Sequence, residues 1–166
     1  MSGWKGRTVL ALLLAVAVAA TAPAAPRRAP VVVAGVVAHV RDGDTIVVGR
    51  TPVRLFGISA PERDHPLGRA ATRFMRRLAL GKAAVCRGDG SRSHDRVVAI
   101  CRIDGRDLGE AVVAAGLARD CPRYSGGRYR AVEARTGPIV EDYELPGYCR
   151  PRGRRTAQLE GSSRLP

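Results

Sequence analysis

A short run of the chain, residues 42–62, brings acidic and basic side chains together. It reads DGDTIVVGRTPVRLFGISAPE, with Asp44 near one end, Arg54 in the middle and Glu62 at the other end. Metal-assisted cleavage of a phosphodiester needs oxygen ligands for the ion, guanidinium groups for the charge on phosphorus, and a carboxylate that handles water. Asp44, Arg54 and Glu62 supply these three kinds of group in turn.

Each of these residues also has an ordinary explanation. Asp-Gly pairs form turns, and a charged side chain at a strand or loop position is commonly a solvated surface group. The combination, rather than any one residue, favours a phosphodiester site.

Strands and helices alternate around this run. Buried or hairpin strands are predicted over 31–37, 45–48, 53–58, 83–87 and 96–103 from their apolar, β-branched composition. Helical spacing predicts helices over 67–78, with Gly81 at its end, and over 108–115, opened by Asp107 with Glu110 as a capping box. A short helix is predicted over 129–135. This order indicates a small barrel or open sheet with helices at its edges.

The two ends of the chain differ from its middle. Lys5 and Arg7 precede the apolar run 9–20, and small residues follow, which is the layout of a secretory signal peptide over residues 1–24. An apolar helix of that length spans about 18 Å against roughly 30 Å of hydrocarbon, so stable membrane insertion is not expected. We expect a linker over 25–30, the folded domain over 31–149, and a basic disordered tail over 150–166.

The four cysteines and the net charge narrow the class of protein. In an exported chain, an even number of cysteines indicates disulfides, and four cysteines allow three pairings that the sequence alone does not distinguish. The formal net charge of +13 favours a polyanionic partner, either nucleic acid or an anionic membrane surface. The richness in Arg, Ala, Gly and Val also fits a GC-rich genome, so charge alone leaves the partner open.

Two separated motifs resemble the thermonuclease family, which includes staphylococcal nuclease. VRDGDT at 40–45, followed by VRLFGISAPE at 53–62, is similar to the family's DGDT and R-L-x-G-I-D-x-P-E segments. HDRVVAICRIDGRDLGEAVVAAGLAR at 94–119 is similar to the family's later strand, turn and helix. The resemblance implies an α+β fold, a five-stranded OB-fold barrel with two or three packed helices.

The resemblance also implies a site and an activity. The family cleaves DNA and RNA, usually with Ca²⁺. Asp44 and the backbone carbonyl of Ala60 would be metal ligands, Arg54 and Arg96 would bind the phosphate and stabilise its transition state, and Glu62 would handle the attacking water. Asp42 would lie behind the ligands, and Tyr124 would contact the substrate base.

Ser59 departs from the family pattern, because it stands where the family has a second metal-binding aspartate. A serine hydroxyl can bind Ca²⁺ but brings no charge, and calcium affinity follows the number of charged ligands. His94-Asp95 is a second departure, since the family often has Tyr-Gly there. We expect strand alternation to point Asp95 away from Arg96.

Within the family fold, the cysteines would pair as Cys86–Cys101 and Cys121–Cys149. The first pair would join neighbouring antiparallel strands, and the second would tie the C-terminal segment YELPGYC to the body of the domain.

Two functions lead, and a basic envelope-associated protein with no nucleic-acid role is a third alternative. The first is an exported, periplasmic or secreted endonuclease with little sequence specificity, acting as a monomer on DNA or RNA with Ca²⁺. The second is a nucleic-acid-binding OB-fold module whose catalysis has weakened or been lost, because Ser59 replaces an acid.

Overall fold

The computed structural model describes residues 28–136 and 143–151. The expected signal peptide, the first part of the linker and nearly all of the basic tail lie outside these residues.

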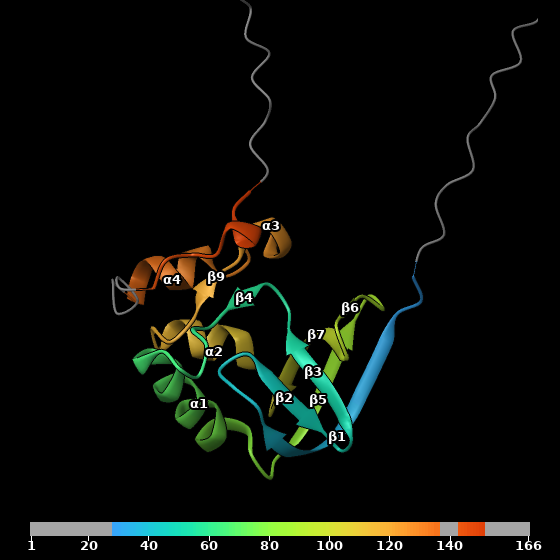
Figure 1. Ribbon diagram of the computed structural model, residues 1–166. Coiled ribbons are helices and arrows are strands. Elements are labelled where there is room, and N and C mark those ends of the chain that lie inside the picture. The colour runs from blue at the N-terminus through green and yellow to red at the C-terminus, as the bar shows by residue number, and fades with distance from the viewer. Residues whose placement is uncertain (1–27, 137–142, 152–166) are drawn as a thin grey trace, which may run out of the picture.

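Five strands close into a barrel (Figure 1). They are β1 (Val31–Val40), β2 (Thr45–Val48), β3 (Thr51–Leu55), β5 (Ala83–Gly88) and β7 (Arg96–Ile103). Antiparallel pairs join β1 to β2, β2 to β3, β1 to β5 and β5 to β7, and a parallel pair between β3 and β7 closes the ring. The α+β, five-stranded OB-type barrel inferred from the sequence is therefore confirmed.

The helices pack around one side and one end of the barrel. They are α1 (Pro66–Ala79), α2 (Leu108–Ala114), the short α3 (Pro122–Ser125), α4 (Arg130–Thr136) and the 3₁₀ turn η1 (Gly147–Cys149). Helix α2 begins as predicted, because the Asp107 side chain accepts hydrogen bonds from the first free backbone N–H groups. The helices and barrel share one apolar core, which includes Val37, Ile46, Leu55, Met75, Leu108 and Val112.

Four two-residue strands complete the structure. They are β4 (Ile58–Ser59), β6 (Arg92–Ser93), β8 (Arg106–Asp107) and β9 (Arg119–Asp120). The strand predicted over 53–58 is wrong in one respect, because the chain turns at Gly57, where φ is +72°, and separates β3 from β4. As a result β4 leaves the barrel and pairs with β9, which sets Ser59 opposite Arg119.

Both disulfides form in the expected pairs. Cys86 and Cys101 are opposite each other on β5 and β7, and Cys121 is bonded to Cys149. No described residue carries a free thiol. Two disulfides indicate an oxidising compartment. In the described part of the chain, every helix is too short or too polar to cross a membrane.

Gly68 lets the first turn of α1 press against the loop that carries Glu62. A Cβ at Gly68 would lie 1.7 Å from the Glu62 carbonyl oxygen, which belongs to the backbone and has no side-chain freedom to move aside. We expect Gly68→Ala to lower the free energy of unfolding by about 1–3 kcal/mol, the usual range for overpacking. Urea denaturation measures the loss.

Gly147→Ala is the matched control, because a Cβ at Gly147 would meet no atom within 4 Å. It should stay within about 0.5 kcal/mol of the wild type. Equal stability of the two variants would show that the loop yields easily at Gly68.

Candidate phosphodiester site

The turn before β2 fixes the position of Asp44. The Asp42 carboxylate accepts a hydrogen bond from the Asp44 backbone N–H at 3.0 Å, which closes the turn. Gly43 allows close packing, since a Cβ there would lie 2.6 Å from the Ala71 side chain and 2.8 Å from that of Ala60. The Asp-Gly-Asp sequence therefore packs the Asp44 turn tightly against α1 and the residues after β4.

The Asp44 carboxylate is buried and fully engaged. Its Oδ1 pairs with the Arg54 guanidinium and accepts the Thr45 hydroxyl at 3.0 Å, and its Oδ2 accepts the Ala60 backbone N–H at 3.1 Å. Burial raises the pKa of Asp44 to about 6, against the opposing attraction of Arg54. Burial works to lower the pKa of Arg54, but the charges of Asp44, Tyr148 and Asp42 together with the hydrogen bond to Asp44 outweigh it and the pKa is raised, so the arginine stays charged.

Arg96 reaches the same place from another strand. Its Nη1 donates to the Thr45 hydroxyl oxygen at 3.0 Å, while its Nε and Nη2 donate to the backbone and side-chain oxygens of Ser93 at 3.2 and 3.1 Å. Thr45 faces Arg54 across the β2–β3 hairpin, and the parallel β3–β7 pair brings the start of β7 alongside. Arg54 and Arg96 are thus linked through Asp44 and Thr45.

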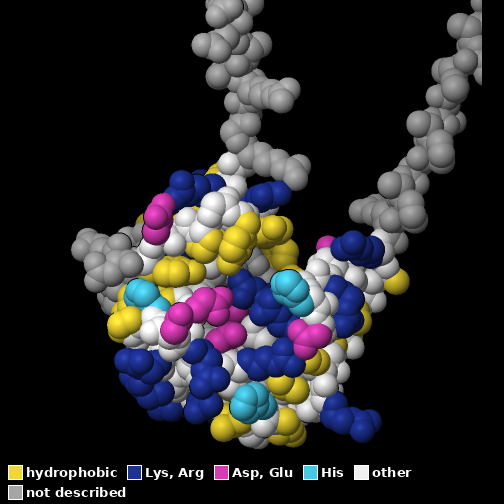
Figure 2. All heavy atoms as spheres, in the orientation of Figure 1, with side chains coloured by type: hydrophobic (Ala, Val, Ile, Leu, Met, Phe, Trp, Pro, Cys, Tyr) yellow, Lys and Arg dark blue, Asp and Glu magenta, His cyan; other side chains and the backbone are white. Residues whose placement is uncertain are grey.

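Glu62 lies on the exposed loop between β4 and α1. Burial is the main cause that raises the pKa of Tyr143, and the negative charge of Glu62 adds a small contribution. Figure 2 shows acidic side chains grouped in the middle of this face of the molecule, bordered by Lys and Arg side chains.

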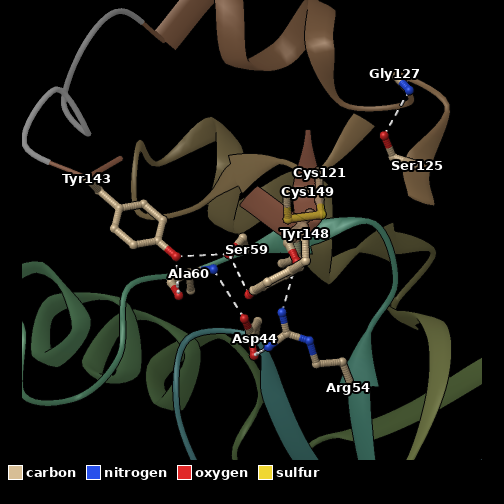
Figure 3. Close-up of a disulfide and its surroundings, with 11 residues drawn as sticks. Asp44, Arg54, Ser59, Ala60, Cys121, Ser125, Gly127, Tyr143, Tyr148 and Cys149 are labelled. Carbon is tan, nitrogen blue, oxygen red and sulfur yellow. Dashed lines mark hydrogen bonds and ion pairs between the residues drawn. A yellow bond between two sulfur atoms is a disulfide. The ribbon is translucent and has the colours of Figure 1, made fainter. Parts of the chain in front are cut away.

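Ser59 is fully buried, and tyrosine hydroxyls cover it (Figure 3). The Tyr143 hydroxyl lies 2.9 Å from Ser59 Oγ and donates to the Ala60 carbonyl oxygen at 3.2 Å. The Tyr148 hydroxyl lies 3.4 Å from Ser59 Oγ. Because Tyr143 gives its proton to Ala60, its oxygen is left to accept the proton of Ser59.

These tyrosines belong to residues 143–150, which we call the C-terminal strap. The disulfide between Cys149 and Cys121 ties the strap to the domain. Arg119 donates to the backbone carbonyl of Tyr143 at 3.4 Å, and the Tyr143 ring packs edge-on against His65 at 6.2 Å between centroids. The strap is therefore held at both of its ends.

The side chains in place do not fit the Ca²⁺ site that the family resemblance implies. Asp44 is paired with Arg54, and both Ser59 Oγ and the Ala60 carbonyl are bonded to Tyr143. Within residues 28–136 and 143–151, no three His, Cys, Asp or Glu side chains are grouped to hold an ion, and every buried side-chain N or O has a partner. The expected ligands thus offer one carboxylate whose charge is already balanced.

Two further expectations concern the edge of the site. Strand alternation is the wrong reason for the position of Asp95, because Asp95 lies in the turn between β6 and β7, where its carboxylate pairs with Arg41 at 2.9 Å while Arg96 has other partners. Tyr124 is 52% exposed on α3, with Arg123 5.7 Å from its ring centre. Its contact with a substrate base stays a prediction, since none of the hydrogen bonds of the described residues joins it to Asp44, Arg54 or Arg96.

Sequence reasoning missed three residues of this site: Thr45, Tyr143 and Tyr148. Thr45 follows Asp44 directly and lies opposite Arg54 in the hairpin, but its bond to Arg96 depends on the pairing of β3 with β7, which the hairpin does not predict. The tyrosines share the segment YELPGYC with Cys149, and the expected disulfide was the signal that this segment returns to the domain.

Thr45 holds the two arginines in one network, and its loss should cost stability. Thr45→Val keeps the shape but removes the hydroxyl between Asp44 Oδ1 and Arg96 Nη1, so we expect a loss of about 1–2 kcal/mol in the free energy of unfolding. Chemical denaturation measures it. The control is Thr51→Val on the same hairpin, and a loss no larger at Thr45 than at Thr51 would contradict the bridging role.

Comparison with known proteins agrees with this geometry. A family model described as staphylococcal nuclease homologue matches residues 52–134, half of the chain. The matched segment contains Arg54, Ser59, Glu62 and Arg96, whereas Tyr143 lies beyond its end. No curated protein gives a significant match to the chain. With the barrel, the helices and this match in agreement, the chain belongs to the staphylococcal nuclease homologue family.

Proposed function

We propose that this domain binds nucleic acid through Arg54 and Arg96 and hydrolyses its phosphodiester bonds. The observation that carries the proposal is the meeting of both guanidinium groups at one buried carboxylate–hydroxyl pair, Asp44 and Thr45. Guanidinium forks match phosphate geometry, and holding two of them in fixed positions pre-organises positive charge where a phosphorane would form.

Each residue has a defined part in this proposal. Arg54 and Arg96 bind the non-bridging oxygens and stabilise the charge that develops on them. Glu62, exposed on its loop, accepts a proton from the attacking water. Asp44 and Thr45 orient the two arginines and do not touch the substrate. No step is assigned to calcium, because the expected ligands are engaged within the protein.

We infer the substrate class from the charge of the chain. The chain carries 28 basic and 15 acidic residues, which favours a polyanion and gives binding that depends on phosphates rather than on sequence. The two disulfides and the signal-peptide-like N-terminal sequence support action outside the cytoplasm, on DNA or RNA.

A second function, binding without cleavage, is favoured by one specific observation. The groups expected to hold the metal face Tyr143 and Arg54 instead of an open position. A site of this kind keeps its phosphate-binding arginines while lacking the ion that accelerates hydrolysis in the family. Cleavage and binding are therefore measured separately.

Hydrolysis of a fluorescent single-stranded DNA tests the first function. Glu62→Gln removes the base and Arg54→Ala removes one phosphate contact, so each should lower kcat/KM by about 10²-fold or more. Arg106→Ala, an exposed arginine on β8, is the control and should retain the wild-type rate. Wild-type turnover equal to that of Glu62→Gln, with calcium or with chelator, would eliminate the nuclease and leave the binding module.

Affinity for the same DNA at several salt concentrations tests the shared phosphate site. Each phosphate contact to a single strand contributes about 0.7 to the slope of log K against log salt. Arg96→Gln should weaken binding and reduce the slope by about that amount, whereas Arg106→Gln should leave it unchanged. An unaltered slope in Arg96→Gln would place the phosphate contacts elsewhere.

A further inference from the structure

The Tyr143 hydroxyl occupies two of the oxygens that the family resemblance assigns to calcium. It lies 2.9 Å from Ser59 Oγ and 3.2 Å from the Ala60 carbonyl oxygen. Both oxygens belong to residues that are at most 5% exposed. A divalent ion that used these ligands would have to displace the hydroxyl and leave it without its two partners.

The charges around the site also oppose replacement of the Tyr143 hydroxyl by a divalent ion. Asp44 is the one carboxylate in the expected ligand set, and Arg54 already balances it. Arg96 adds a second positive group through Thr45. Calcium affinity rises with the number of charged ligands, so an ion entering here would find little net attraction. A tyrosine hydroxyl satisfies Ser59 and Ala60 without bringing any charge.

The strap is built to keep the hydroxyl in place. The Cys121–Cys149 bond closes a loop of 28 residues, and Cys149 is fully buried. Arg119, which faces Ser59 across the β4–β9 pair, holds the backbone of Tyr143 and is itself paired with Glu133 at 2.9 Å. The strap lies beyond the residues that the family model matches.

We propose that Tyr143 takes the place of a divalent ion beside Ser59 and Ala60, so that this domain binds nucleic acid without calcium. The exchange is a paired one, in which a serine replaces the acid and a tyrosine on the strap replaces the ion. The statement about calcium stands on the contacts of Tyr143, and the statement about nucleic acid rests on the proposed function.

Calorimetric titration of calcium chloride into the full domain tests the exchange. The wild type should bind calcium with a Kd of about 1 mM or weaker, the weak end of protein calcium sites. Ser59→Asp restores the acid but leaves Tyr143 in place, whereas Ser59→Asp with Tyr143→Phe restores the acid and frees the oxygens. The double variant should bind calcium at least tenfold more tightly than Ser59→Asp alone.

Tyr143→Phe alone covers the case in which Ser59→Asp does not fold. It keeps the ring against His65 and removes one hydroxyl, so calcium affinity should rise at least threefold over the wild type. Tyr124→Phe removes a tyrosine hydroxyl outside this network and should leave calcium affinity unchanged. A wild-type Kd for calcium in the micromolar range would overturn the proposal. It would also be overturned if Tyr143→Phe, alone or combined with Ser59→Asp, did not tighten calcium binding.

Fluorescence anisotropy with a single-stranded oligonucleotide, in chelator and in calcium at equal ionic strength, tests the second statement. Wild-type affinity should agree within twofold between the two buffers, and a gain of fivefold or more in calcium would overturn it. Absence of DNA binding in both buffers would instead refute the proposed function, while the calcium titration would still decide the role of Tyr143.

Discussion

The buried carboxylate of Asp44 is the contact around which the site is arranged. A charge taken out of water needs close partners, and this one has a guanidinium, a hydroxyl and a backbone N–H. Each partner comes from a different point of the fold: Arg54 from β3, Thr45 from β2 and Ala60 from the chain after β4. Satisfying one carboxylate therefore fixes the relative positions of the hairpin, the loop that carries Glu62 and, through Thr45, the start of β7.

The C-terminal strap completes the other side of this site by a different means. Hydroxyl groups, rather than charges, meet Ser59 and the Ala60 carbonyl, and a disulfide rather than a long helix holds them there. Closing a loop of this length is worth about 3–4 kcal/mol in the chain-entropy account, enough to keep a short, largely irregular segment in register. Burial, first of all, raises the pKa of Tyr143, so its hydroxyl is a neutral donor at physiological pH.

Local patterns predicted much of the fold, and the family resemblance predicted its closure. The hairpin, α1 and the Asp107 cap follow from side-chain periodicity and turn chemistry within short windows. The break at Gly57 was missed because the apolar run continues through it to Ile58. The contact of Tyr143 with Ser59 joins residues 84 apart and leaves no periodic signal. The roles given to Glu62 and Tyr124 remain predictions, because no described hydrogen bond of their side chains tests them.

The central claim is that Arg54 and Arg96 act as one phosphate-binding unit through Asp44 and Thr45. A double-mutant cycle on single-stranded DNA affinity, with Arg54→Gln, Arg96→Gln and the double variant at constant salt, tests it most directly. If the unit is real, the second substitution costs less once the first is made, and the coupling energy is about 1 kcal/mol or more. Losses that add without coupling would show two independent surface charges and would contradict the account.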